Sequence, residues 1–410
     1  MFPDHRKSGQ FSGLILGGLL LTASAFVQAQ TSNIRIGVPT ALQLQVGLDT
    51  VDSMHIAVEE INAKGGVNGR KLELIVADET ENPRTGIATI KKLIGEGKAD
   101  VLIGGYASGV ALAQLPHISR AKIIYLGVGA ASPRITQSVK QDYENYKYIF
   151  RVNPINANHQ ARALADFVSG FVIGELGLRK IAIIGENIKW VQDLVPILRK
   201  DASSAGADVR LAEFFDSKTS DFAPLLSRIK DSGAQFVVTI LSHASSDVFV
   251  KQWYDSRLPI PIGGIDVKSM DADFYKRVDG KAISEITGNL SVRVPITPKT
   301  IPYWDAFVKK TGRGGPAYSG PGAYDAVYLY AEAVRRAKTT EADAVIKELE
   351  KIDYVGVLGR IQFDDTHDVK AGPGFVQLGF AQWQDKGERA IVWPKELRTG
   401  RATFPPWIKR

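Results

Sequence analysis

Over most of the chain, short hydrophobic runs alternate with longer stretches in which apolar residues recur every three or four positions. In 49–62, for example, Val51, Met54, Val58 and Ile61 fall on one face of a helix. Such alternation is typical of a parallel sheet flanked by helices, so we expect an α/β lobe with a doubly wound sheet. The pattern predicts strands at 34–38, 72–77, 101–104 and 123–128, and helices at 49–62, 84–96 and 110–120.

The same alternation starts again after 149–154. Such a half-repeat predicts two similar lobes. Beyond 259–264 the pattern is looser, with a helix at 322–337 and an antiparallel pair over 375–393 that turns at Lys386-Gly387. In the second half the pattern predicts helices at 159–173, 191–205 and 222–232, and strands at 181–185, 208–214 and 236–241.

The first residues resemble an export signal. A charged head at 5–7 precedes an apolar stretch at 14–26 and the small-residue sequence Val-Gln-Ala at 27–29. A membrane anchor is the alternative, but the apolar stretch is shorter than the roughly 20 residues of a spanning helix. We expect a signal peptide over 1–29 that is cleaved after Ala29, and a periplasmic protein.

Composition excludes several classes of chemistry. The chain has no Cys, which removes disulfides, thiol catalysis and cysteine metal sites. The net charge of +7 comes from 51 basic residues scattered among 44 acidic ones, so we expect no nucleic-acid partner. His117, His159 and His243 lack a metal-ligand spacing, and we expect no metal and no cofactor.

In doubly wound sheets, ligands bind beyond the carboxyl ends of the strands. One such loop, 104–111, contains Tyr106, Ala107 and Ser108 and leads into a helix. Free N–H groups at the helix start favour an anion, and the Ser108 hydroxyl could add a hydrogen bond. The alternative is that Ser108 only caps its helix.

The loop after the next predicted strand, 127–133, contains Gly129, Ala130 and Ala131. It fails as a dinucleotide fingerprint, because it has no third glycine and runs into a proline. The stretch 105–109 reads Gly-x-x-Ser-Gly and therefore fails as a nucleophile elbow, which needs Gly-x-Ser-x-Gly. We therefore expect the exposed backbone of this loop to bind a small ligand, and we expect that the protein is not an enzyme.

In the second half, Trp190 follows the predicted strand 181–185, Ser242 and His243 follow 236–241, and Asp266 follows the run Ile-Gly-Gly at 262–264. Asp266 could pair an amine. The alternatives are that Trp190 packs between lobes and that Asp266 caps a helix. Their shared position at strand ends favours a ligand site.

Five stretches along the chain resemble one family, the type I periplasmic binding proteins of the branched-chain amino-acid-binding group of ABC transporters. They occur in the family's order and span nearly the whole chain after the signal. They are 34–38 (IRIGV), 57–74 (AVEEINAKGGVNGRKLEL), 101–105 (VLIGG), 324–328 (YDAVY) and 359–364 (GRIQFD).

The resemblance implies two doubly wound, Rossmann-like lobes joined by a multi-strand hinge. We assign 33–152 plus 289–356 to the first lobe and 153–288 plus 357–410 to the second. The lobes would close around a ligand and deliver it to a membrane permease, with the protein expected to be a monomer. A sensing module that reports a solute to a receptor is the alternative.

The resemblance also implies roles for single residues. The ligand's carboxylate would be held by Ser108 and the second loop, Trp190 would close over the ligand, and Asp266 would pair its amine. Ser242 stands where the family often has an aromatic, and Ala131 where it often has a Thr or Ser. The resemblance implies an amino acid or a related small carboxylate as the ligand. The two departures remove polar and aromatic contacts, and they favour the alternative of a larger or less polar acid, such as an aromatic carboxylate.

Overall fold

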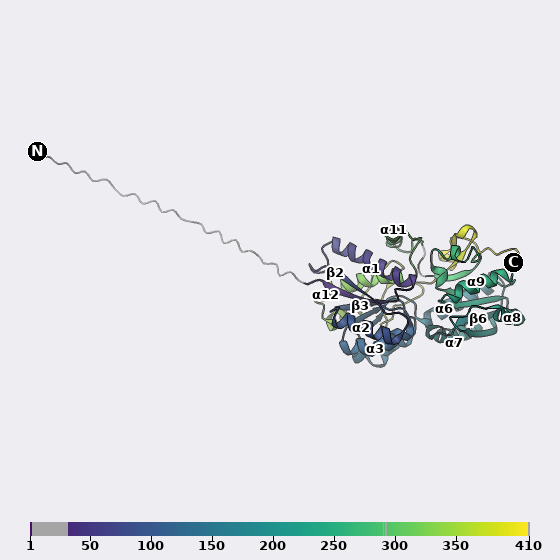
Figure 1. Cartoon of the computed structure of the whole chain (residues 1–410), viewed down its shortest axis with the longest axis horizontal. Coiled ribbons are helices and arrows are strands. Elements are labelled where there is room, and N and C mark those ends of the chain that lie inside the picture. The colour runs from purple at the N-terminus through teal and green to yellow at the C-terminus, as the bar shows by residue number, and fades with distance from the viewer. Residues whose placement is uncertain (2–31, 290, 292, 409–410) are drawn as a thin grey trace. The chain divides into compact units, whose positions relative to one another are not determined.

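The computed structural model describes residues 1, 32–289, 291 and 293–408. Apart from Met1, the predicted signal peptide lies outside the described residues. Two sheets carry the fold, and the order of elements along residues 33–408 follows the predicted alternation of strands and helices (Figure 1).

The first sheet has the order β2-β1-β3-β4-β5, and all of its strands are parallel. With the helices packed on it, this sheet forms the first lobe. Its early elements are β1 (Ile34–Thr40), α1 (Gln45–Ala63), β2 (Leu72–Asp78), α2 (Pro83–Gly95), β3 (Val101–Gly104), α3 (Ser108–Ala121), β4 (Ile124–Gly127), α4 (Arg134–Gln141), α5 (Tyr143–Tyr146) and β5 (Ile149–Arg151). Its late elements are α11 (Thr300–Thr311), α12 (Ser319–Ala337) and α13 (Ala342–Leu349). A separate two-stranded sheet follows, formed by β11 (Tyr354–Val355) and β12 (Arg360–Ile361).

The second sheet has the order β14-β13-β10-β9-β8-β6-β7, in which β13 and β14 are antiparallel. With its helices it forms the second lobe. Its elements are α6 (Ala157–Phe167), η1 (Val168–Ile173), β6 (Lys180–Glu186), α7 (Lys189–Ser204), β7 (Asp208–Phe215), α8 (Ala223–Asp231), β8 (Phe236–Leu241), α9 (Ser245–Asp255), β9 (Ile262–Asp266), η2 (Lys268–Met270), α10 (Phe274–Arg277), β10 (Ile286–Asn289), β13 (Gly379–Trp383), η3 (Asp385–Gly387), β14 (Arg389–Trp393) and η4 (Lys395–Leu397).

The central strands of both sheets, such as β3, β4 and β8, are buried on both faces, which explains their continuous hydrophobic sequences. In β3, Val101 and Ile103 face the cluster that includes α1 and α12, whereas Leu102 faces α2 and α3. In β6, Ile183 faces α6 and α7, whereas Ile184 faces α8 and α9. Because side chains alternate across a strand, one apolar run can serve two helical layers.

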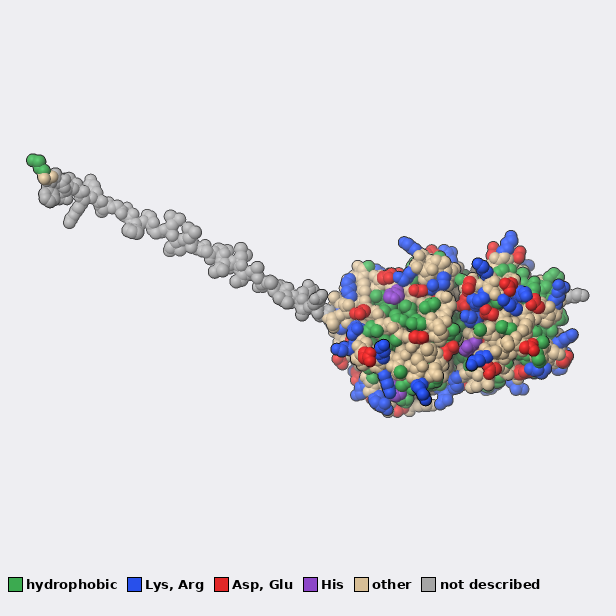
Figure 2. Space-filling model, viewed as in Figure 1, with side chains coloured by type: hydrophobic (Ala, Val, Ile, Leu, Met, Phe, Trp, Pro, Cys, Tyr) green, Lys and Arg blue, Asp and Glu red, His purple; other side chains and the backbone are tan. Residues whose placement is uncertain are grey.

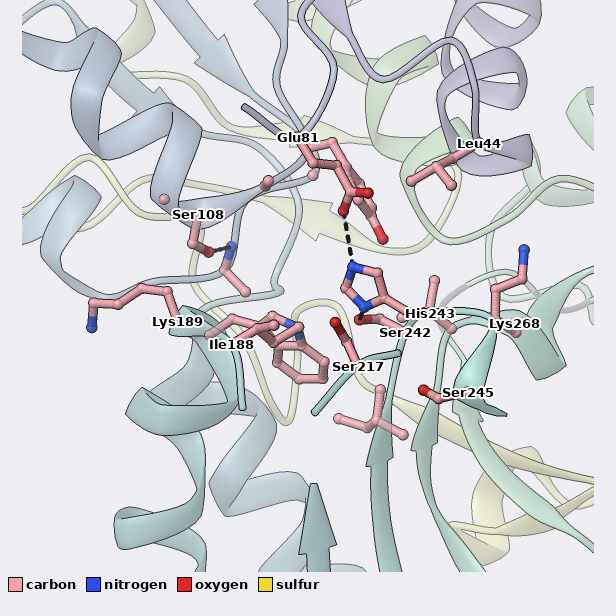
Figure 3. A pocket seen from close by; sticks show the side chains of 18 of the residues that line it. Leu44, Glu81, Ser108, Ile188, Lys189, Ser217, Ser242, His243, Ser245 and Lys268 are labelled. Carbon is pink, nitrogen blue, oxygen red and sulfur yellow. Dashed lines mark hydrogen bonds and ion pairs between the residues drawn. The ribbon is translucent and has the colours of Figure 1, made fainter. Parts of the chain in front are cut away.

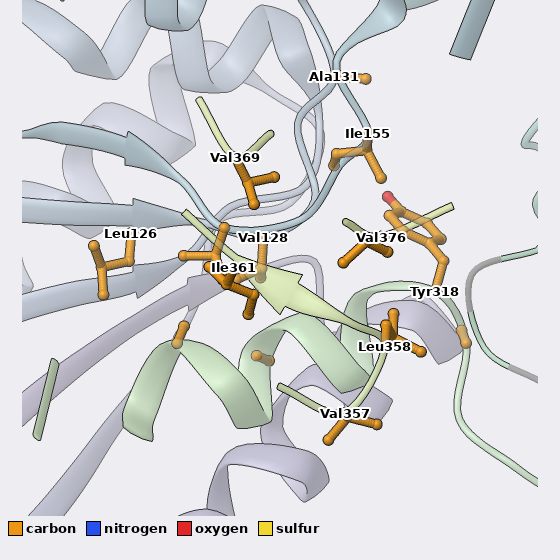
Figure 4. Close-up of a cluster of buried hydrophobic side chains, with 14 of the residues drawn as sticks. Leu126, Val128, Ala131, Ile155, Tyr318, Val357, Leu358, Ile361, Val369 and Val376 are labelled. Atoms are coloured by element: carbon orange, nitrogen blue, oxygen red, sulfur yellow. The ribbon is translucent and has the colours of Figure 1, made fainter. Parts of the chain in front are cut away.

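The chain passes between the lobes at short segments. It leaves the first sheet after β5, returns after β10 and joins the second sheet again at β13. The buried ion pair between Arg151 and Asp368, at 2.8 Å, ties the first and last of these crossings together. Beside it, Val128, Ile155 and Val376 lie in one apolar cluster (Figure 4). The residues at which one lobe ends and the other begins stay a prediction.

The predicted strands at 101–104 and 236–241 coincide with β3 and β8, and the antiparallel pair is confirmed as β13 and β14. Two predictions were wrong in detail. The helix expected over 159–173 changes to π-helical geometry at Val168, and the antiparallel pair begins at Gly379 rather than at 375.

Charged side chains of both signs are interspersed over the visible face of the molecule (Figure 2). This distribution forms no continuous basic surface there. Among the described residues, no helix combines the length and apolarity that crossing a bilayer requires.

Candidate functional site

A cavity of about 860 Å³ lies where the loops after strands of both sheets meet (Figure 3). Its walls come from the loops after β3, β4, β6 and β8 and from Tyr318 and Leu378. Most of the predicted site residues line it: Tyr106, Ala107, Ser108, Gly129, Ala131, Trp190, Ser242 and His243. Ala130 and Asp266 do not.

Ser108 joins the two loops of the first lobe. Its Oγ accepts hydrogen bonds from the backbone N–H groups of Ala131 (3.1 Å) and Ser132 (3.0 Å). The interpretation of Ser108 as a helix cap is wrong, because the N-cap of α3 is Ala107 and Ser108 is the first helical residue. A hydroxyl has two acceptor sites and one proton, so Ser108 keeps its proton for a further acceptor.

Close backbone contact explains the glycine in the second loop. A Cβ on Gly129 would lie 2.2 Å from the carbonyl oxygen of Gly105, and Tyr318 donates its hydroxyl proton to the Gly129 carbonyl at 2.9 Å. Ala130 lies on the other side of this loop, packed in the apolar cluster with Leu102 and α3. Ala130, which the sequence predicted to be a ligand-binding residue, therefore has its side chain in the core and does not line the cavity.

Glu79 was not predicted from the sequence. Its side chain holds the loop after β3 in place from the buried side. It is fully buried, and its carboxylate accepts hydrogen bonds from the Tyr106 N–H (2.8 Å) and from the Gln114 side chain (2.8 Å). Burial raises the pKa of Glu79 to about 7, against the effect of these hydrogen bonds. The Tyr106 N–H is thus already engaged, and Glu79 positions the loop.

Three helices, α3, α7 and α9, begin at the wall of this cavity. In the described structure, the N-caps Ala107, Ile188 and Ala244 make no side-chain hydrogen bond to the first turns of these helices. All three N-caps line the cavity. Since helix N-termini carry unsatisfied N–H groups and partial positive charge, this wall favours a negatively charged group.

His243 connects the two lobes inside the cavity. Its Nδ1 lies 2.8 Å from Glu186 Oε2, at the end of β6. Its Nε2 lies 3.1 Å from Glu81 Oε1, in the loop after β2 (Figure 3). Burial lowers the pKa of His243, but the hydrogen bonds to Glu186 and Glu81 outweigh it and raise the pKa to about 10. The imidazole is therefore protonated at neutral pH.

Glu186 is fully buried and accepts five hydrogen bonds. The donors are the N–H and hydroxyl of Ser242, the N–H and ring of His243, and the hydroxyl of Ser245. Burial raises the pKa of Glu186, but these hydrogen bonds, led by that of His243, bring it below its usual value. Ser242 therefore lines the cavity with its hydroxyl committed to Glu186.

Trp190 lies at the cavity wall in the first turn of α7 and also packs against the main apolar core. Lobe packing and contact with the cavity, which the sequence left as alternatives, are thus combined in one side chain. An indole ring at this position offers a flat apolar surface to a ligand.

Asp266, which the sequence predicted to pair the ligand's amine, does not line the cavity. It is fully buried, and its carboxylate accepts hydrogen bonds from the Ser246 hydroxyl and from the backbone N–H groups of Lys268 and Ser269. Asp266 thus binds the first N–H groups of the short helix η2, although the N-cap residue of η2 is Val267. Burial raises its pKa to about 6, against these hydrogen bonds.

Lysines outnumber acids among the described residues that line the cavity. Lys189, Lys218 and Lys268 line it, whereas Glu81 supplies the one carboxylate. Lys189 pairs with Asp193, and Lys268 lies 3.2 Å from Asp271. Lys189 and Lys268 are thus paired with acids, and Lys218 adds its charge to the positive ends of the helix N-termini.

The remaining chemistry can be judged from the same contacts. Ser108 Oγ is bound by two backbone N–H groups and has no imidazole beside it in the described structure, so it lacks the general base of a hydrolase. Within the described part of the chain, no three His, Asp or Glu side chains are grouped to hold a metal ion.

The chain is similar to known proteins along its length. Residues 34–388 match the family model described as periplasmic binding protein. A leucine-, isoleucine-, valine-, threonine- and alanine-binding protein of Pseudomonas aeruginosa is 24% identical over 375 residues, covering 89% of this chain and 94% of that protein.

Solved structures share the fold. A leucine-binding protein, LivK, from Thermotoga maritima has a TM-score of 0.75 at 18% identity, covering 87% of this chain and 97% of that one. A solute-binding protein of an ABC transporter from Rhodopseudomonas palustris, in complex with 3,4-dihydroxybenzoic acid, has a TM-score of 0.76 at 19% identity, covering 92% and 99%. With a family model that matches most of its length and two parallel-stranded lobes around a cavity, this chain belongs to the periplasmic binding protein family.

Proposed function

We propose that the protein is the solute-binding component of an ABC importer and that it closes its two lobes around an amino acid or a related small carboxylate. One observation carries the proposal: a cavity between the lobes is lined by three helix N-termini that no side chain caps. A carboxylate there would accept hydrogen bonds from first-turn N–H groups and from the Ser108 hydroxyl.

The rest of the cavity suits the body of such a ligand. Tyr106, Trp190 and Tyr318 offer aromatic surface, and Ile155 and Leu378 offer aliphatic surface. Ligand sites commonly combine apolar walls with a few polar groups that fix orientation. The names of the relatives support this reading, since one binds branched-chain amino acids and one was solved with an aromatic acid.

Membership of the family places the chain in the periplasm. We propose that the signal peptide ends at Ala29 and that the exported protein acts as a monomer which delivers its solute to a membrane permease. Closure would be driven by contacts that the ligand makes with both lobes only in the closed state. No bond is made or broken in this cycle.

A thermal-shift screen of the protein purified from the periplasm tests the proposal. The panel contains amino acids, aromatic and aliphatic acids, dicarboxylates and the matching amides. A carboxylate at 100 times its dissociation constant should add ~2.7 kcal/mol to the free energy of unfolding. The matching neutral amide should give a much smaller shift. A panel in which no carboxylate raises the melting temperature contradicts the proposal.

A pair of variants at Gly109 locates the binding group. Gly109 is exposed in the first turn of α3, and a Cβ there meets no atom within 4 Å. Gly109→Asp places a negative charge beside the proposed carboxylate and should abolish binding, whereas the isosteric Gly109→Asn should retain most of it. An acid in the first turn stabilises a helix, so Gly109→Asp should still fold. Equal binding by both variants would place the carboxylate elsewhere.

A further inference from the structure

We propose that His243 serves as a built-in cation of the site, so that the cavity selects carboxylic acids that carry no positively charged amine. The inference rests on the proposed function and narrows its ligand class. It is carried by the geometry of the Glu81, His243 and Glu186 side chains.

The two ring nitrogens of His243 each face a carboxylate oxygen, at 2.8 Å and 3.1 Å. A neutral imidazole has a single N–H and could donate to only one of them, whereas an imidazolium donates to both. The two carboxylates also come from different lobes, Glu81 after β2 and Glu186 in β6. The protonated ring therefore fills the position between two acids that a ligand ammonium would need.

No other acid on the cavity wall can take an ammonium. Glu81 is the single carboxylate among the described residues that line the cavity, and it already pairs with His243. Glu186 is fully buried and accepts five hydrogen bonds, which leaves it no accessible surface. Asp266 is buried behind the wall and holds η2.

An amine-bearing ligand would meet repulsion as well as a missing partner. Lys189, Lys218 and Lys268 line the same cavity. Lys189 and Lys268 pair with Asp193 and Asp271, so the repulsion comes mainly from Lys218 and from His243. An ammonium that loses water without gaining a carboxylate is strongly disfavoured. The carboxylate of the same molecule would still find the helix N-termini. The site thus favours the acid over the corresponding amino acid.

Matched ligand pairs test the inference on the wild-type protein. Isothermal titration calorimetry compares 3-phenylpropanoate with phenylalanine, 4-methylpentanoate with leucine, and the corresponding 2-hydroxy acids. Whichever skeleton binds, the acid without the amine should bind about ten-fold more tightly or better, a difference of about 1.4 kcal/mol. Tighter binding of the amino acid overturns the inference but leaves the proposed function standing. A panel in which no carboxylate binds overturns the proposed function, and the inference with it.

His243→Asn tests the named residue. Removal of the imidazolium leaves Glu81 without its cation, so the preference for the acid over its amino-acid partner should shrink about ten-fold or reverse. His117→Asn, the same change in α3 and away from the cavity lining, should leave the preference unchanged. An unchanged preference in His243→Asn contradicts the assignment.

Glu81→Gln provides a second test in case His243→Asn does not fold. This variant should fold, because Glu81 is partly exposed and His243 keeps Glu186 as its partner. If the inference holds, Glu81→Gln keeps the preference for the acid. A selective loss of amine-bearing ligands in this variant would show that Glu81 is itself an ammonium partner, and the inference would be wrong.

Discussion

The wall of the cavity in the first lobe is held together mainly by close backbone approach and hydrogen bonds to the Ser108 hydroxyl, with Glu79 as a buried support, whereas the wall in the second lobe is held together by a network of charged side chains. In the first lobe, two loops approach closely at Gly105 and Gly129, and Ser108 joins them through two N–H groups. In the second lobe, Glu186 gathers the N–H groups and hydroxyls of the following loop and pairs with His243. A substitution should therefore act sterically on one wall and electrostatically on the other.

The two walls are also expected to select the ligand by different properties, the first wall by its shape and the second by its charge. Backbone and small side chains make the first wall a rigid surface with N–H groups for a carboxylate. The second wall contains ionised groups that are already paired, so its contribution depends on pH and on the charge of the ligand. Variants on each wall can be used to separate these effects.

The largest effect is expected for Glu186→Gln. The amide cannot accept all five hydrogen bonds, and His243 loses its buried partner, so the free energy of unfolding should fall by about 3 kcal/mol. Urea denaturation followed by circular dichroism measures this. Glu213→Gln, which breaks an exposed pair with Arg228, is the control and should cost less than about 1 kcal/mol. Equal losses would show that Glu186 has no special role.

The pH dependence sharpens this prediction. The pKa of His243 rises from 6.5 to about 10 on folding, because hydrogen bonds to Glu186 and Glu81 outweigh the lowering effect of burial. Its contribution to stability is therefore full below pH 6.5 and is lost as the pH rises through about 10. The pKa of Glu186 falls below 4.5, so its contribution is full above pH 4.5 and is lost in acid. The stability gap between wild type and Glu186→Gln should be widest between pH 4.5 and 6.5.

The sequence predicted the first wall better than the second. The loops after β3 and β4 stood out because small residues directly follow buried strands, and that pattern is local in the sequence. Glu79 and Glu186 end or follow strands as single acids and gave no local signal. Their partners Tyr106 and His243 lie 27 and 57 residues away, so their roles follow only from the tertiary fold.

Asp266 also shows what the sequence could not predict, although here the residue itself was selected. Its predicted placement at a strand end was correct, since it is the last residue of β9. The direction of its side chain was not, because a carboxylate at a strand end can turn either into a cleft or back onto the next helix. Here the N–H groups of Lys268 and Ser269 determine the direction. Sequence position gives the loop, and local hydrogen bonds decide which way the side chain points.

A smaller effect is expected for Gly129→Ala in the first wall. The new Cβ would lie 2.2 Å from the Gly105 carbonyl oxygen, so the two loops must separate. Overpacking of this kind should lower the free energy of unfolding by about 2 kcal/mol and should weaken carboxylate binding. Gly109→Ala on the same wall is the control, because a Cβ there meets open space. Thermal unfolding with and without ligand measures both effects, and equal behaviour of the two variants would exclude a tight contact at Gly129.

The smallest effect is expected for Ser108→Ala, which removes the hydroxyl that joins the two loops. The N–H groups of Ala131 and Ser132 lose their acceptor, but water in the adjoining cavity can replace it, so stability should fall by about 1 kcal/mol. The proposed carboxylate also loses one donor, and its binding should weaken by about 1 kcal/mol or more in calorimetry. Ser108→Thr keeps the hydroxyl and should restore both values. If Ser108→Ala loses stability but not affinity, the hydroxyl joins the loops without touching the ligand, and the carboxylate depends on the helix N-termini alone.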